Sequence, residues 1–168
     1  VISPLIFMDQ LKLSTHEFSL TLLLYGAAYV TGGIVARILS NWLAPTTQII
    51  FGLALIFCSG LLMLFLSRVF ELSTVTVLVP MIICTTGTTI CRPIATSKAM
   101  DVFPDSAGTA ASAGNTLIFM LGGLISALIN ISTINLQMTL ALTFLLLSTT
   151  ALVLSSLISR RQQLLDVG

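Results

Sequence analysis

Charged residues are scarce in this chain of 168 residues: seven Lys and Arg and six Asp and Glu make up 8% of the sequence. Soluble domains contain about 25% charged residues. A soluble fold of this size needs a large polar exterior, because small domains have much surface for their volume, yet 56% of this sequence is hydrophobic. The lack of charge therefore excludes a soluble globular domain. Together with a mean hydropathy of +1.08, it indicates an integral membrane protein.

Basic clusters, histidine-based sites and cysteine frameworks are also missing. The net charge is +1, and without a patch of Lys and Arg the chain is not expected to bind nucleic acid. The single histidine, His16, lies at the edge of an apolar run, where a solvated side chain is favoured over a proton relay, so no enzyme is expected. Cys58, Cys84 and Cys91 match neither a disulfide framework nor a zinc site. We therefore predict no catalytic residue, no metal and no cofactor.

Long runs without Asp, Glu, Lys or Arg define the membrane spans, because a hydrocarbon core about 30 Å thick requires roughly 20 helical residues. A polar break at 40–45 interrupts one run, and the run over 106–159 is long enough for two crossings hinged near 130–135. The complete spans predicted are 18–39, 46–67, 72–91, 106–129 and 135–158.

The segment 1–8 is apolar but too short to cross a membrane, and we interpret it as the end of a helix whose beginning is missing. The predicted fold class is therefore an all-α integral membrane protein. It forms one unit over 1–168, with five complete transmembrane helices after a truncated first helix.

Two segments have the composition of helix starts. Ser14 and Glu17 have the spacing of a capping box, with Leu13 and Phe18 placed as a hydrophobic staple. Asp105 precedes the span that begins at 106, where a carboxylate favours a helix N-terminus. Both positions agree with the division into spans.

Basic residues are distributed unequally between the two sides of the membrane. Because connections alternate sides, Lys12 and Arg68 lie on one side, and the others lie opposite: Arg37, Arg92, Lys98, Arg160 and Arg161. The positive-inside rule then places the loops at 37–45 and 92–105 and the C-terminus in the cytoplasm.

The span over 72–91 is rich in threonine and contains Pro80, which is expected to kink it. Its hydroxyls have two interpretations that the sequence does not separate. They line a water-filled pathway, or they bond back to carbonyls of their own helix.

The span over 106–129 opens with nine small residues. Helices approach closely over small residues, so tight helix packing is the favoured role for five positions: Gly108, Ser112, Gly114, Gly122 and Gly123. Within the same span Asn115 needs a polar partner, and by helical spacing it shares a face with Phe119.

Tyr25 and Tyr29 are one helical turn apart in the first complete span. Tyrosines in such a place line a cavity for aromatic or cationic ligands, or they pack with the hydroxyl satisfied, which is the commoner case. Both interpretations remain open at this stage.

Two segments carry a resemblance to a known family. They are Phe103-Pro104-Asp105-Ser106-Ala107-Gly108-Thr109-Ala110-Ala111-Ser112, and Ile2-Ser3-Pro4-Leu5-Ile6-Phe7 ahead of Leu13-Ser14 and Phe18. With these segments the chain resembles the C-terminal half of a major facilitator superfamily transporter of the Bcr/CflA-type drug-resistance branch. The likeness extends from about Ile2 to Arg161. One departure is Cys91-Arg92-Pro93-Ile94, where the family often has glycine and asparagine before the proline.

This resemblance implies the six-helix half of a major facilitator fold, with its first helix truncated. It implies a proton-coupled antiporter that exports small amphipathic or cationic drug-like substrates by alternating access, in the bilayer of the bacterial inner membrane, together with an N-terminal half missing here. The spans over 18–39, 72–91 and 106–129 would face the central cavity. The residues expected to contact substrate there are Tyr25, Tyr29, Met81, Asn115 and Phe119.

Two alternatives remain beside the transporter. The chain is a truncated and inactive product, or it is a non-transporting membrane subunit that pairs with another half through its small-residue faces.

Overall fold

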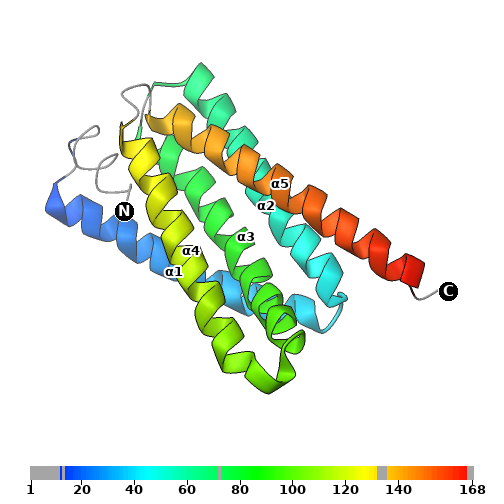
Figure 1. Cartoon of the computed structure of the whole chain (residues 1–168). Coiled ribbons are helices and arrows are strands. Elements are labelled where there is room, and N and C mark those ends of the chain that lie inside the picture. The colour runs from blue at the N-terminus through cyan, green and yellow to red at the C-terminus, as the bar shows by residue number, and fades with distance from the viewer. Residues whose placement is uncertain (1–11, 13, 72, 132–135, 166–168) are drawn as a thin grey trace.

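The computed structural model describes residues 12, 14–71, 73–131 and 136–165. It contains five long helices: α1 (Thr15–Ser40), α2 (Pro45–Val69), α3 (Thr74–Asp101), α4 (Ala107–Ile131) and α5 (Leu136–Leu165), with a short 3-10 turn η2 (Pro104–Ser106) before α4 (Figure 1). Five segments are long and apolar enough to cross a membrane. The predicted all-α membrane fold with five complete spans is confirmed, and the segment 1–8 lies outside the described residues.

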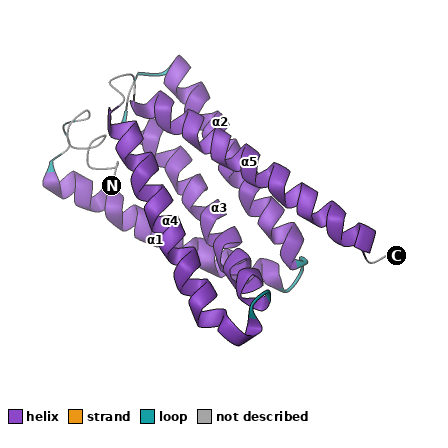
Figure 2. Ribbon diagram, viewed as in Figure 1, coloured by secondary structure: helices purple, strands orange, loops and turns teal. Residues whose placement is uncertain are grey.

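Consecutive helices run in opposite directions, joined by short connections (Figure 2). α3 is the central element and contacts α1, α2 and α4, while α5 packs chiefly on α2. At one end of the bundle, α1 and α3 finish and α2 and α4 begin. Arg37, Arg92 and Lys98 lie near this end, so we call it the basic end.

Helix α1 begins as the sequence predicts. The Ser14 backbone N–H donates to Glu17 Oε2 at 2.9 Å, and the Glu17 N–H donates to Ser14 Oγ at 3.3 Å, which completes the capping box. The staple involves Leu13, which lies outside the described residues. Helix α2 begins with Pro45 at its first position, where the missing N–H of proline costs no hydrogen bond.

The loop expected over 92–105 is mostly helical, which corrects that prediction. α3 continues through Pro93 to Asp101 before the chain turns at η2. Runs of apolar residues show where a helix leaves hydrocarbon, but not where its backbone hydrogen bonds stop. A helix that has crossed a membrane can continue in water because these bonds are internal.

Two glycines allow α2 and α3 to approach closely. A Cβ added at Gly52 would lie 2.7 Å from the carbonyl oxygen of Gly87, and one added at Gly87 would lie 2.6 Å from that of Gly52. Farther along α2, Gly60 lies against the side chain of Leu145 in α5. The apolar core of the described residues consists of Met63, Val77, Ile129, Leu140 and Ala141.

Helix α4 lies at the edge of the bundle. It contacts α3 and, to a smaller extent, α5, and in Figure 1 it crosses in front of α1 and runs beside α3. Large apolar side chains are exposed along it, including Leu117, Met120 and Leu124. The described part of the chain therefore leaves most of the α4 surface uncovered.

Candidate functional site

A cavity of about 530 Å³ opens between α1, α2 and α3 near the basic end. Its wall is largely apolar, with Val30, Ile90 and Ile94 among its residues. Five polar side chains also line it: Tyr29, Arg37, Ser40, Gln48 and Thr89. An apolar pocket with a few converging polar groups is the usual form of a small-molecule site, so this cavity is the candidate site.

Gln48 is the most constrained polar residue in the cavity wall. Its side chain is 2% exposed, and its Nε2 donates to the Leu43 carbonyl oxygen at 2.9 Å. Its Oε1 has no hydrogen-bond partner among the described residues. Because the Nε2 bond holds the amide in one orientation, a buried acceptor is left unpaired beside the cavity.

Thr89 contributes two oxygens to the same region. Its hydroxyl donates to the Thr85 carbonyl oxygen at 2.6 Å. Its own carbonyl precedes Pro93 by one helical turn, and proline has no N–H with which to bond it. The helix therefore leaves a second acceptor without its usual donor at this level of α3.

The wall between α1 and α3 depends on small residues of α1. Gly32 is buried, and a Cβ there would lie 3.2 Å from the Cβ of Thr89. Gly33 lines the cavity itself. The two glycines thus allow α1 to approach α3 at Thr86 and Thr89.

Hydroxyls along α3 bond to their own helix. Thr85, Thr86 and Thr88 donate to the carbonyl oxygens of Met81, Ile82 and Cys84 at 2.8–3.0 Å. Of the two interpretations of this threonine-rich span, internal satisfaction is what the structure shows at these positions. The kink at Pro80 stays a prediction, since α3 is continuous through it.

The residues expected to contact substrate fall into three places. Tyr25 and Met81 meet between α1 and α3, where the tyrosine hydroxyl donates to Met81 Sδ at 2.8 Å. Tyr29 is 51% exposed and lines the cavity. Asn115 and Phe119 lie apart from these on α4, where Phe119 is 73% exposed. Among these five, the structure thus brings Tyr25 and Met81 into contact, and substrate contact stays a prediction for all five.

The small residues of α4 do not pack against any of the residues that the structure describes. A Cβ at Gly108, Gly114, Gly122 or Gly123 would meet no atom within 4 Å among the described residues. Ser112 is exposed, and its hydroxyl donates to the Thr109 carbonyl oxygen. Their predicted close packing therefore has no counterpart here and stays a prediction about a partner surface.

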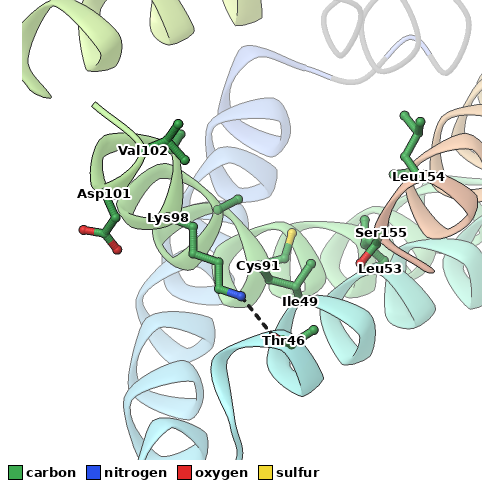
Figure 3. Close-up of a pocket in the computed structure, with 12 residues that line it drawn as sticks. Thr46, Ile49, Leu53, Cys91, Lys98, Asp101, Val102, Leu154 and Ser155 are labelled. Carbon is green, nitrogen blue, oxygen red and sulfur yellow. Dashed lines mark hydrogen bonds between the residues drawn. The ribbon is translucent and has the colours of Figure 1, made fainter. Parts of the chain in front are cut away.

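The basic side chains are separated. Arg37 lines the candidate site, and Arg92 is exposed. Lys98 donates to Thr46 Oγ1 at 3.0 Å and lines a second cavity of about 710 Å³ between α2, α3 and α5, where Leu154 lies on the opposite wall (Figure 3). The side chains of Arg160 and Arg161 lie outside the described residues.

Sequence reasoning missed the polar contacts that hold Pro80. Ser59 Oγ donates to the Pro80 carbonyl oxygen at 2.6 Å. Gln137 Nε2 lies 3.5 Å from the Thr76 carbonyl oxygen, which is the carbonyl that Pro80 deprives of its helical donor. The available signal was an amide or hydroxyl placed inside an otherwise apolar run, which needs a partner somewhere.

Comparison with known proteins gives one result. A family model described as Major Facilitator Superfamily matches residues 1–127, which includes α1 to α3 and most of α4. No curated protein matches the chain. No solved structure matches it either.

Proposed function

This chain belongs to the major facilitator superfamily, and on that premise we propose that it is the C-terminal half of a Bcr/CflA-type drug-efflux transporter. The observation that carries the proposal is the cavity between α1, α2 and α3. It combines apolar walls with a few polar groups on helices of a transporter family. Small amphipathic or cationic compounds and protons are the proposed cargo.

Alternating access requires two walls around a site near the midplane of the membrane. This chain supplies one wall, formed by α1, α3 and α4, with α2 and α5 packed behind α3. The exposed face of α4 supports a second half that covers it, because uncovered small residues permit close approach between helices. The two halves would rock against each other and open the space between them to one side of the membrane at a time.

Proton coupling requires a group that titrates within the membrane. The described carboxylates are Glu17, Glu71, Asp101 and Asp105, and each lies at a helix end or in a connection. Buried acids are the usual proton carriers in transporters. We therefore propose that the coupling acid belongs to the N-terminal half, and that the proposed bacterial inner membrane supplies the proton gradient.

The test measures transport by the natural gene product that contains this chain, in inside-out bacterial membrane vesicles. We expect respiration to drive accumulation of the cationic dye ethidium or of the amphoteric drug norfloxacin, and a protonophore to abolish it. Vesicles that contain only this chain should match empty vesicles. If neither compound moves under a pH gradient, the efflux proposal is wrong.

A second candidate is a non-transporting subunit that pairs through α4, which the uncovered glycines of that helix favour. The mass of the detergent-solubilised chain separates the possibilities. A discrete dimer supports a pairing subunit, whereas heterogeneous aggregates support a truncated, inactive product.

A further inference from the structure

The second cavity, between α2, α3 and α5, has a cation at its shallow end and apolar side chains in its deeper wall. We propose that it holds one phospholipid molecule, with the phosphate at the Lys98 ammonium group and an acyl chain along the apolar wall. This site is separate from the candidate cavity between α1, α2 and α3, and it does not depend on the proposed efflux function. It follows from the membrane fold and from the groups that line the cavity.

The depth of the cavity follows from its lining residues. On α2 these begin with Thr46, in the first turn of the helix, and end with Leu53, about two helical turns farther into the membrane. On α5, Ala151 and Leu154 line the cavity and belong to the segment Gln137–Leu157, which is long and apolar enough to cross a membrane. The cavity therefore extends from the basic end of the bundle into the hydrocarbon level, as a lipid does.

Lys98 provides the positive charge at the shallow end. Its Nζ donates to Thr46 Oγ1 at 3.0 Å, and this bond holds the ammonium group at the first turn of α2 (Figure 3). The ammonium group has three donors, of which this bond uses one, and it forms no ion pair with the described residues. Lysine commonly binds phosphate as a point charge. The unused donors of Lys98 are therefore suited to a phosphate group.

Thr46 supplies a further donor beside Lys98. Its oxygen accepts the bond from Lys98 Nζ, and its own hydroxyl hydrogen has no acceptor in the part of the chain that the structure describes. Nζ and Oγ1 are 3.0 Å apart, a spacing at which each can donate to a different oxygen of the same phosphate group. The two side chains thus form a small anion-binding mouth.

Asp101 limits the charge of the headgroup. It is the one acidic side chain among the described residues that line this cavity, and in Figure 3 its carboxylate points away from the Lys98 ammonium group. Asp101 is exposed, and it would repel a second negative charge more than a first. A phosphodiester carries a single negative charge, whereas a phosphate monoester carries about two. The cavity is therefore better suited to a phosphodiester lipid than to free phosphate.

The deeper wall of the cavity requires an acyl chain. Leu154 is 60% exposed on the wall opposite Lys98, although it lies at membrane level (Figure 3). An apolar surface of this kind is favourably covered by hydrocarbon, and a phosphate without chains would leave it bare. The apolar residues that an acyl chain would contact are Ile49, Leu53, Ala95, Ala151 and Leu154.

Photolabelling of the purified natural gene product that contains this chain tests the site. The probe is dioleoylphosphatidylglycerol with a diazirine near the middle of one acyl chain, added in dodecyl maltoside micelles, and mass spectrometry of the peptides locates the attached lipid. We expect saturable labelling of α5 over 151–155 or of α2 over 49–53.

Competitors separate the parts of the ligand. Unlabelled dioleoylphosphatidylglycerol should compete about tenfold better than dioleoylglycerol, which has the same chains without the phosphate. Glycerol phosphate, which has the phosphate without the chains, should not compete at the same concentrations.

Variants assign the two ends of the cavity. Lys98→Gln should weaken labelling about tenfold. Arg92→Gln removes a cation of α3 that lines neither cavity; it is the matched control and should label as the natural protein does. Ala95→Phe should block the acyl chain and leave Lys98 in place. Lys98→Glu should lose the phospholipid and gain labelling by a trimethylammonium lipid with the same chains and diazirine, a gain that a misfolded variant cannot show.

Four results would overturn the proposal: no saturable labelling of either segment, equal competition by dioleoylglycerol and dioleoylphosphatidylglycerol, equal competition by glycerol phosphate, or equal losses in Lys98→Gln and Arg92→Gln. Competition by glycerol phosphate would show a site for a free phosphate group instead of a lipid. Because labelling measures binding alone, its outcome is independent of whether ethidium or norfloxacin is transported.

Discussion

Gly52 and Gly87 bring the backbones of α2 and α3 into contact. A Cβ atom on either glycine would lie within 2.7 Å of the carbonyl oxygen of the other glycine. Real Cβ atoms do not approach oxygen so closely. The two helices that form the centre of the bundle therefore depend on the absence of a side chain at both positions. Several consequences of this packing can be measured.

Replacing Gly87 by alanine should destabilise the chain. Overpacking costs about 1–3 kcal/mol, which outweighs the helix-propensity gain of up to about 1 kcal/mol. Titration with sodium dodecyl sulfate followed by circular dichroism measures the free energy of unfolding. Gly122→Ala is the matched control: a Cβ there meets nothing within 4 Å in the described chain, so its stability should stay level or rise. Equal losses for the two variants would contradict the close contact.

Gln137 should contribute to the stability of the chain because it bonds the carbonyl oxygen that Pro80 leaves without a helical donor. Its Nε2 serves the Thr76 carbonyl oxygen, so Gln137→Leu should lower the free energy of unfolding by about 0.5–1.5 kcal/mol. In a Pro80→Ala background the new backbone N–H can serve that carbonyl, and the same substitution should cost less. A double-mutant cycle in the same titration measures this coupling. Identical costs in both backgrounds would show that Gln137 acts independently of the proline.

Ser59→Ala should remove a buried hydrogen bond. Ser59 is fully buried and donates to the Pro80 carbonyl oxygen at 2.6 Å, and the loss of such a bond costs about 1 kcal/mol. Ser112→Ala removes an exposed hydroxyl that bonds its own helix and should have no measurable effect. Thermal denaturation of the two variants in detergent compares them directly, and matching melting temperatures would contradict the role of Ser59.

The two tyrosines of α1 should differ in efflux by the complete transporter. Tyr29 lines the candidate cavity, so Tyr29→Ala should slow accumulation of norfloxacin in inside-out vesicles severalfold. Tyr25→Phe removes only the hydroxyl that contacts Met81 Sδ and should change transport little. Expression of each variant is matched by immunoblot. A larger defect in Tyr25→Phe than in Tyr29→Ala would reverse the assignment.

The helices could be predicted because the membrane makes charge expensive. Uncharged runs reveal each span, and the capping box at Ser14 and Glu17 is a local pattern within one turn. The end of α3 could not be read this way, since Arg92 to Asp101 are polar enough for a loop and yet remain helical. Hydropathy measures the fit to hydrocarbon, and it does not measure helix length.

The contacts between helices were mostly beyond the sequence. Tyr25 and Met81 were singled out separately, and only the rotation of α1 against α3 brings them together. Gly52 and Gly87 have no special spacing to neighbouring small residues, whereas the conspicuous glycines of α4 contact nothing nearby in the described chain. Helix rotation is set by packing against neighbours, and a single sequence does not state it. The buried position of Gln48 beside the cavity could not be predicted for the same reason, because in the sequence it is a single amide in an apolar run.

The continuation of α3 beyond Pro93 carries this helix well past its close contact with α2 at Gly52 and Gly87. At 1.5 Å per residue, Asp101 lies about 21 Å along the axis from Gly87, so a tilt of about 10° would carry the tip about 4 Å sideways. Lys98 lies in this last part of α3, and the short turn into α4 follows it. A tilt of α3 about that contact would therefore displace the first residues of α4 farther than the residues beside Gly87.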